Sequence, residues 1–262
     1  MSEHAVDDPA ELAAILAQLP SPILLVFDCD GVLAPLVDHA DDSVLTPGVA
    51  ERLVSLAAAR PGDVRVAVLS GRSLDGLAQF AFDESIIVVG SYGGERRDRE
   101  PHPLDDDEAA LLRLLDDEAT RACQLAGPGA WVERKPASVV LHVRQADRDA
   151  GAKALADLAQ RQRSIAGSQA HAGSDVLELM ARPSNKGLAL QQLCDDEAPA
   201  STVYLGDDLP DEDAFAVLGA GDIGIKIGLG ETRAPHRLQD PTAVSVFLDR
   251  LLDRLLDRAS EQ

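Results

Sequence analysis

Basic residues are scarce in this sequence. The 262-residue chain has 24 Lys and Arg against 45 Asp and Glu, a formal net charge of −21 at pH 7. Nucleic acids and anionic membrane surfaces attract basic proteins, so the charge balance excludes both as expected partners. An anionic substrate would also meet net repulsion, and a phosphate site in this chain would therefore need local cations or a metal.

Cysteines and long apolar runs are few as well. The three cysteines are odd in number and far apart, which is typical of reduced thiols rather than of a disulfide framework. No apolar run approaches the roughly 20 residues of a membrane span. The first twenty residues carry four acids and no Lys or Arg, so no signal peptide is visible. We therefore expect a cytoplasmic protein.

Several sequence signatures of phosphate and redox chemistry are missing. The chain has no Gly-x-x-x-x-Gly-Lys loop and no Cys-x-x-Cys pair. The cysteine-phosphatase pattern fails at every cysteine, because Pro35, Gly129 and Ala200 stand where an Arg is needed. The sequence thus argues against a P-loop nucleotidase, a dithiol oxidoreductase and a cysteine phosphatase.

What the sequence does have is an apolar strand that ends abruptly on acids. Ile23 to Phe27 predicts a buried strand, and Asp28-Cys29-Asp30-Gly31 follows it directly. A simple Asx turn is one interpretation of this end, and a nucleophilic aspartate with a second acid beside it is another. A calcium loop is excluded, because Val32 and Leu33 stand where an acid or Asn and then Gly are needed.

A second acidic stretch follows a later apolar strand. Gly206-Asp207-Asp208-x-x-Asp211-Glu212-Asp213 places five acids within seven residues after the predicted strand 202–205. These carboxylates repel one another unless a cation lies among them, and oxygen ligands of this kind suit Mg²⁺. The alternative is an exposed acidic helix N-terminus.

Ser70 and Lys186 are two further candidates. Ser70 stands at the end of a predicted strand, where taken alone it would be an ordinary helix cap. Lys186 stands at the start of a predicted helix, where taken alone it would be a solvated side chain.

The order of apolar runs predicts the fold. Strands at 23–27, 64–69 and 86–89 alternate with helices, including one that begins near Thr46 as its N-cap; this rhythm indicates a parallel sheet with right-handed crossovers. A long helix at 104–123 and strands near 131–144 and 168–180 interrupt it, and it returns from Asn185. We therefore expect an α/β protein with a Rossmann-like core at 1–97 and 183–262 and an inserted α+β module at 98–182.

The motifs together resemble a known superfamily. Asp-x-Asp-Gly, Ser, Lys and Gly-Asp-Asp-x-x-Asp occur in the order of the four motifs of the haloacid dehalogenase superfamily, whose sugar-phosphatase branch carries an α+β cap. More narrowly, the sequence resembles the trehalose-6-phosphate phosphatase family. The motifs that carry this resemblance are Ser70-Gly71-Arg72, Val132-Glu133-x-Lys135-x-x-Ser138, His142-x-Arg144, Leu177-Glu178, Asn185-Lys186-Gly187 and the Gly206–Asp213 stretch. Tyr92 departs from the family, which usually has His at that position.

The resemblance implies a function and assigns residues to it. It implies Mg²⁺-dependent hydrolysis of a small-molecule sugar phosphate, trehalose 6-phosphate above all, through an aspartyl-phosphate, by a chain that we expect to be a monomer. Another glycosyl or pseudosugar phosphate is the alternative that Tyr92 keeps open, and a catalytically silent binding protein is a third. The implied roles are catalysis for Asp28 and Asp30; phosphate binding for Ser70, Gly71 and Lys186; metal binding for Asp28, Asp30, Asp207, Asp208 and Asp211; and substrate binding for Arg72, Glu133, Lys135 and Glu178.

The inserted module carries the last of these residues on predicted strands. Strand alternation would place Glu133 and Glu178 on the face opposite to Val132 and Leu177, where a solvated surface and a sugar-facing surface look alike. For Trp131, beside Glu133, we expect packing in the core rather than stacking on a sugar.

Overall fold

The computed structural model describes residues 6–37, 39–100 and 103–260. The chain divides into two compact units, of which unit 1 comprises 1–100 with 185–262 and unit 2 comprises 101–184. The insertion expected from the sequence spans 98–182.

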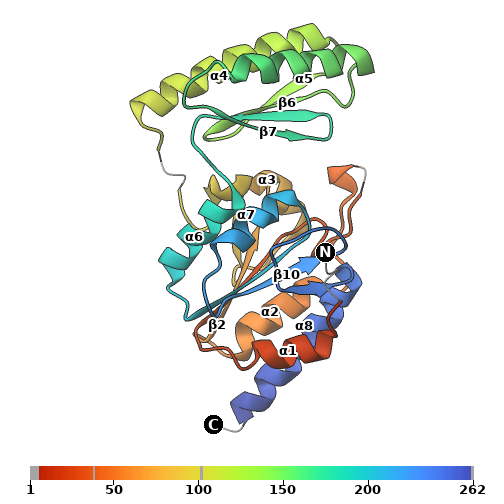
Figure 1. Ribbon diagram of the computed structural model, residues 1–262, viewed down its shortest axis with the longest axis vertical. Helices are drawn as coiled ribbons and strands as arrows, with labels where there is room; N and C mark the ends of the chain where they lie inside the picture. The colour runs from red at the N-terminus through yellow and green to blue at the C-terminus, as the bar shows by residue number, and fades with distance from the viewer. Residues whose placement is uncertain (1–5, 38, 101–102, 261–262) are drawn as a thin grey trace. The chain divides into compact units, whose positions relative to one another are not determined.

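Unit 1 is built on one seven-stranded sheet with the strand order β11-β10-β9-β1-β2-β3-β4 (Figure 1). Its strands are β1 (Ile23–Phe27), β2 (Val64–Leu69), β3 (Ile87–Gly90), β4 (Glu95–Arg96), β9 (Ser201–Gly206), β10 (Ile223–Ile227) and β11 (His236–Leu238). Its helices are α1 (Pro9–Leu16), α2 (Val49–Ala59), α3 (Leu74–Leu77), α6 (Lys186–Glu197), α7 (Leu209–Val217) and α8 (Pro241–Ser260). All neighbouring strands pair in parallel except β3 and β4. The expected α/β fold with a parallel sheet is confirmed.

The central strand β1 is buried on both faces, which explains its uninterrupted apolar sequence. Alternate side chains enter two different clusters: Leu25 and Phe27 pack with α1, α2 and α8, whereas Leu24 and Val26 pack with α6 and α7. The helices thus form a layer on each side of the sheet (Figure 1). Because both layers hold β1, the residues that follow Phe27 leave the sheet at a fixed place.

Unit 2 is a four-stranded antiparallel sheet in the order β5-β6-β8-β7, covered on one face by two helices (Figure 1). Its elements are β5 (Trp131–Arg134), β6 (Ser138–His142), β7 (Gln169–Gly173), β8 (Val176–Met180), α4 (Asp106–Ala126) and α5 (Arg148–Gln162). Leu141 and Leu179 from the strands pack against Leu115 of α4 and Leu158 of α5. The expected α+β composition of the insertion is confirmed.

The structure adds detail to the sequence-based expectation at three places. The short strands β4 and β11 were not predicted, because two or three residues carry no periodic signal. The segment 168–180, for which strand was expected, is a hairpin of β7 and β8. Helix α2 has Gly48 as its N-cap, not Thr46, whose backbone carbonyl instead accepts a hydrogen bond from Val49 N.

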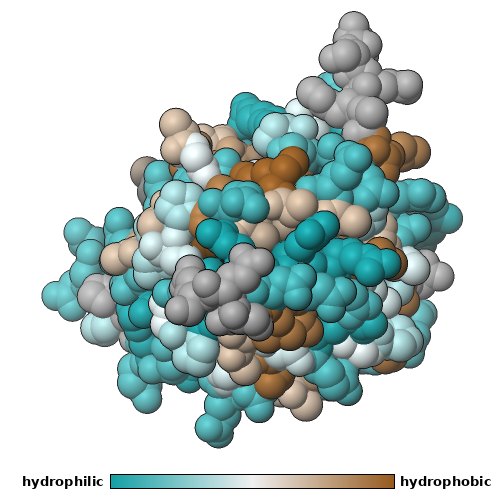
Figure 2. Space-filling view, turned by 90° about the horizontal axis from the view of Figure 1, so that it is seen from below, coloured by the Kyte–Doolittle hydropathy of each residue, from teal (hydrophilic) through white to brown (hydrophobic). Residues whose placement is uncertain are grey.

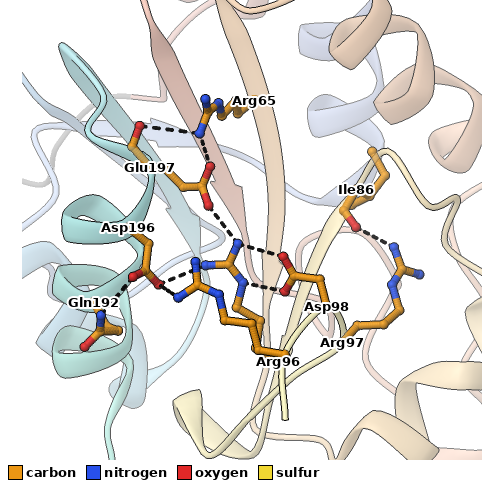
Figure 3. Close-up of polar contacts among 9 residues, drawn as sticks. Arg65, Ile86, Arg96, Arg97, Asp98, Gln192, Asp196 and Glu197 are labelled. Carbon is orange, nitrogen blue, oxygen red and sulfur yellow. Dashed lines mark hydrogen bonds and ion pairs between the residues drawn. The ribbon is translucent and has the colours of Figure 1, made fainter. Parts of the chain in front are cut away.

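A network of ion pairs ties the segment after β3 to α6 (Figure 3). The Arg96 guanidinium binds Asp196 at 3.0 Å and Glu197 at 2.7 Å, and Arg99 binds Asp196 at 2.6 Å. Arg65 of β2 also pairs with Glu197. The C-terminal end of α6 is therefore held by three arginines, which fixes the helix whose first residue is Lys186.

Figure 2 shows one face on which hydrophilic side chains predominate and hydrophobic ones lie interspersed among them. The apolar side of α8, with Phe247, Leu248 and Leu251, is buried in the hydrophobic core of unit 1. Among the described residues, no helix is both long enough and apolar enough to cross a membrane.

Candidate active site

The sequence-predicted residues of unit 1 meet at the carboxyl ends of three adjacent strands. β1 lies between β9 and β2, so Asp28 follows the central strand, Asp207 follows β9 and Ser70 follows β2. In open α/β sheets, ligands bind outside the carboxyl ends of strands where the chain order reverses direction. The topology therefore gathers residues that are up to 179 positions apart in the sequence.

Asp28 is paired with Lys186. Asp28 Oδ2 lies 2.8 Å from Lys186 Nζ, and Asp28 Oδ1 accepts a hydrogen bond from Cys29 N. Both side chains are buried. Burial alone would lower the pKa of Lys186, but the carboxylates of Asp28 and Asp211 raise it above its ordinary value. The ammonium thus stays charged beside Asp28, which is the local cation that an anionic substrate needs in an acidic protein.

Asp211 is the second partner of Lys186 and is fully buried. Its Oδ1 accepts from Lys186 Nζ and from Tyr204 Oη, each at 2.6 Å. Its Oδ2 accepts from the backbone N–H groups of Asp207 and Asp208, each at 2.9 Å. Two oxygens of a carboxylate offer about four lone-pair positions, and these donors occupy them. Asp211 is therefore positioned to orient Lys186, and four donors already share its two oxygens.

Asp207 lies next to Asp28 with fewer partners. The carboxylate oxygens of Asp28, Asp207 and Asp211 lie within 4.8 Å of one another, which is compact enough to hold a metal ion. Burial raises the pKa of Asp207 to about 6, and the neighbouring Asp211 adds to the shift. Gly31 makes room for this carboxylate: a Cβ at its positive φ of 77° would lie 2.0 Å from Asp207 Oδ2. Burial and the neighbouring carboxylate disfavour the ionised form of Asp207, and a bound cation would favour it. This environment therefore fits a cation site.

Asp30 is held by Arg72. Arg72 Nε donates to Asp30 Oδ2 at 2.6 Å and Arg72 Nη2 donates to Asp30 Oδ1 at 2.7 Å, a bidentate pair. Ser43 Oγ also donates to Asp30 Oδ1. Arg72 Nη1 donates to the carbonyl of Ala40, and the Arg72 guanidinium lies over the Phe80 ring. Arg72, expected to bind substrate, is thus engaged with the expected acid–base residue.

Ser70 and Gly71 form a tight turn after β2. Ser70 is buried, and its Oγ accepts a hydrogen bond from Arg72 N at 3.1 Å. The ring of Tyr92 lies against Gly71, because a Cβ at that glycine would come within 2.6 Å of Tyr92 Oη. Tyr92 N also donates to the carbonyl of Ser70. The residue that departs from the family pattern therefore lies directly beside the expected phosphate-binding turn.

Asp208 is not part of the compact acid cluster. It is exposed and caps α7: Asp208 Oδ1 accepts from Leu209 N at 2.7 Å, and Asp208 N donates to Asp211 in a reciprocal capping box. The helix-terminus interpretation weighed for the acidic stretch thus holds for Asp208, whereas Asp207 faces the cluster.

The expected substrate residues of unit 2 form two pairs on its sheet. Glu178 Oε1 accepts from Ser138 Oγ at 2.6 Å and from Lys135 Nζ at 3.2 Å. Glu133 Oε2 lies 3.0 Å from His142 Nε2, and this hydrogen bond lowers the pKa of Glu133. Leu177 and Leu179 pack towards the helices, so alternation places Glu178 on the opposite face of the sheet.

Three residues near the site were missed by sequence reasoning. Tyr204 is fully buried in β9 with its hydroxyl on Asp211, and Ser43 binds Asp30. Lys226 is buried in β10 and donates to the backbone carbonyl of Asp207. A polar-tipped residue inside an apolar strand was a signal for Lys226 and for Tyr204, which also stands directly before the acidic stretch, whereas nothing in the sequence distinguished Ser43.

The haloacid dehalogenase fold is defined by a parallel sheet and an inserted module. Its central strand presents a buried aspartate paired with a lysine, and a carboxylate from the next strand lies beside that aspartate. This chain has all of these features, with an α+β insertion. Within that fold the sequence matches the trehalose-phosphatase family over residues 26–243. The chain belongs to this family.

Individual relatives agree with this assignment. The trehalose-6-phosphate phosphatase of Escherichia coli is 35% identical over 232 residues, covering 86% of this chain and 85% of that protein. The trehalose-phosphate phosphatase of Mycobacterium tuberculosis is 36% identical over 242 residues, again 86% of this chain. This chain spans 60% of the length of that mycobacterial relative. The C-terminal domain of the Candida albicans trehalose-6-phosphate phosphatase shares the fold, with a TM-score of 0.76, 22% identity and coverage of 97% and 99% of the two chains.

Proposed function

We propose that this protein hydrolyses a sugar phosphate, trehalose 6-phosphate in particular, through a phosphorylated aspartate. The observation that carries the proposal is the pairing of buried Asp28 with Lys186 at 2.8 Å, at the end of the central strand. The ammonium would neutralise charge between a carboxylate nucleophile and an anionic phosphoryl group. Family membership and the printed activity of the relatives support the same reaction.

The reaction has two displacement steps. In the first, an oxygen of Asp28 forms a bond to phosphorus while the bond from phosphorus to the sugar oxygen breaks. Asp30 gives its proton to that leaving oxygen. In the second, water attacks phosphorus and gives a proton to Asp30, and the Asp28–phosphorus bond breaks to release phosphate. The bidentate contact from Arg72 orients Asp30 as a carboxylate, the form that takes the proton from water in the second step, and one Asp30 oxygen must leave Arg72 when it carries the proton for the first step.

The donor set fits a hard divalent cation. Oxygen atoms from carboxylates are the ligands that Mg²⁺ prefers, and the raised pKa of Asp207 marks a carboxylate that gains from a nearby positive charge. Asp28 and Asp207, with the backbone carbonyl of Asp30, would hold the ion, and Asp211 would orient Lys186. Mg²⁺ bound there supplies charge neutralisation that lets an anionic phosphoryl group approach the aspartates.

The remaining roles divide between the two units. Ser70, the Gly71 backbone and Lys186 would bind phosphoryl oxygens in unit 1. Glu133, Lys135 and Glu178 of unit 2 would bind sugar hydroxyls, since carboxylates and ammonium groups held by neighbours offer fixed hydrogen-bond directions.

Phosphate release from a panel of sugar phosphates tests the proposal. With Mg²⁺ present, we expect trehalose 6-phosphate to give the highest kcat/KM, and Asp28→Asn to abolish turnover because an amide does not attack phosphorus. Asp83→Asn, which changes an exposed acid far from the cluster in sequence, is the matched control and should leave activity unchanged. A higher kcat/KM for another glycosyl phosphate would favour the alternative that Tyr92 supports, and a chain that binds the sugar phosphate without releasing phosphate would be a silent binding protein.

A further inference from the structure

The sheet of unit 2 carries an exposed aromatic ring that the proposed roles above do not use. Trp131 is the first residue of β5 and lies directly opposite His142 of β6. The indole and imidazole rings are stacked, with centroids 3.9 Å apart and planes at 0°. Trp131 is nevertheless 49% exposed, so core packing, the role expected from the sequence, is wrong.

Strand register shows which face of the sheet bears this ring. Val132 packs against the helix-covered cluster, and so do Leu141 and Val143 on either side of His142. Trp131 and His142 therefore lie on the face opposite to α4 and α5. Glu133, two residues after Trp131, lies on that same face.

The ring is held in one orientation. His142 supports it from one side, and Glu133 fixes His142 through the 3.0 Å contact to Nε2. An aromatic side chain that is already immobilised loses little conformational entropy when a ligand covers it. An exposed ring with this support differs from a scattered surface hydrophobe, because two side chains are used to fix its position.

The chemistry of this group of side chains suits a sugar. The face of an aromatic ring is negative, and the C–H groups on the face of a pyranose are weakly positive, so the two attract while burying apolar surface. Carboxylates beside the ring accept hydrogen bonds from hydroxyls at the sugar's edge. A ring next to Glu133 thus offers both contacts that a pyranose requires.

We propose that Trp131 is a specificity-determining residue on which a pyranose ring of the substrate stacks, with Glu133 accepting from its hydroxyls. The proposal rests on the proposed sugar-phosphatase function and adds the residue that recognises the sugar ring.

The chain itself supplies a reporter, because Trp131 is its only tryptophan. In the full-length Asp28→Asn variant, which should not turn over, trehalose 6-phosphate is expected to change the tryptophan emission in a saturable way. Inorganic phosphate, which lacks a sugar ring, should leave the emission unchanged. An emission spectrum that stays constant up to saturating trehalose 6-phosphate would overturn the proposal.

Kinetics with substituted chains provide the second test. Trp131→Ala should lower kcat/KM for trehalose 6-phosphate by about tenfold, the upper end of an aromatic stacking contribution, mainly through KM. Trp131→Phe should restore most of the loss, because it keeps a ring face. Neither variant should change kcat/KM for an aryl phosphate. Leu114→Ala, at an apolar residue of α4 that is 46% exposed, is the matched control and should behave as the wild type.

Failure of this inference differs visibly from failure of the proposed function. If the wild type releases phosphate from a sugar phosphate and Trp131→Ala does so equally well, the stacking role is wrong and the phosphatase function stands. If the wild type releases no phosphate from any sugar phosphate, the function is wrong, and the emission titration decides independently whether Trp131 binds the sugar. An equal loss on sugar and aryl phosphates in Trp131→Ala would mean a folding defect and would also count against the stacking role.

Discussion

At the scale of single residues, the bidentate contact between Arg72 and Asp30 is the feature of the site that most constrains its chemistry. Arg72 donates to the carbonyl of Ala40 and lies over the Phe80 ring, and these contacts fix its position. The Arg72 guanidinium therefore sets the orientation of the Asp30 carboxylate. The hydrogen bonds to Asp30 also raise the pKa of Arg72. We propose that a residue placed in this way acts through Asp30 rather than by contact with the substrate.

We therefore expect Arg72→Ala to lower activity in a way that depends on the leaving group. General acid–base catalysis contributes roughly 10²–10⁴-fold, so kcat for trehalose 6-phosphate should fall by about 10²-fold or more. The first-turnover burst of nitrophenolate from an aryl phosphate should change little, because that leaving group departs without a proton. Steady-state kinetics and rapid-mixing experiments measure the two quantities.

The double variant Arg72→Ala, Asp30→Asn is the control for this assignment. Because both residues serve one proton transfer, the double variant should be no slower than Asp30→Asn alone. Equal rises in KM for both substrates, with kcat intact, would instead make Arg72 a phosphate ligand.

Asp207 leads to a prediction about pH. Its pKa in the folded chain is about 6, above the ordinary value of 3.8. A carboxyl with a raised folded pKa contributes stability that is fully present below about pH 4 and is lost as pH rises through 6. In chelator, Asp207→Asn should therefore melt at the same temperature as the wild type at pH 4 and on the order of a few degrees higher at pH 7.5.

The comparison is made by thermal melts of both proteins from pH 4 to pH 8. Using the difference between the two chains removes the contribution of the carboxylates that lie away from Asp207, because the two chains share their titration. A difference that is largest at pH 4 would contradict the raised pKa. Excess Mg²⁺ should reverse the order at pH 7.5, because it stabilises only the chain that keeps the Asp207 carboxylate.

At the scale of elements, the start of α7 separates two adjacent acids by function. Asp208 caps the helix, whereas Asp207 faces the cluster. Asp208→Ala should cost about 1 kcal/mol of stability, the usual value of an N-cap, and lower Tm by about 2–4 °C. It should leave Mg²⁺ affinity nearly unchanged. Asp207→Ala should abolish Mg²⁺ affinity, and metal titrations by calorimetry would distinguish the two. Equal losses of affinity would make Asp208 a metal ligand after all.

The longer elements were predictable from sequence because their apolar patterns are long. The five buried apolar residues of β1 predict a buried strand, and the amphipathic repeat of α8 predicts a helix. β4 and β11 were not predictable, since strands this short exist only through pairing with a neighbour. The cap of α2 was assigned to Thr46 from residue preference alone, whereas the chain turns through Gly48 in the left-handed region.

The site was partly predictable for a related reason. Asp28, Lys186 and Asp207 stand at strand ends and helix starts, and parallel topology brings such positions together. The partner of each side chain was not predictable. Arg72 donates to Asp30, and Asp211 accepts hydrogen bonds from four donors. Both sets of contacts depend on side-chain packing, which the spacing of residues in the sequence does not predict.

At the scale of the whole molecule, the two units have separate hydrophobic clusters. The clusters of unit 1 draw on β1 and its flanking helices, whereas that of unit 2 draws only on residues between Leu111 and Ala181. Proteins with more than one core often unfold in more than one step. We therefore expect two transitions in calorimetric melts of the full chain in chelator.

Mg²⁺ should act on one of these transitions only. The acid cluster lies in unit 1, so a ligand that binds there stabilises unit 1 by about 2.7 kcal/mol at 100 times its Kd, and unit 2 not at all. One transition should rise by several degrees with Mg²⁺ while the other keeps its temperature. In Asp207→Asn, Mg²⁺ should move neither. A single transition that Mg²⁺ moves as a whole would show that the two units unfold together, and the stability of unit 2 would then depend on the metal bound to unit 1.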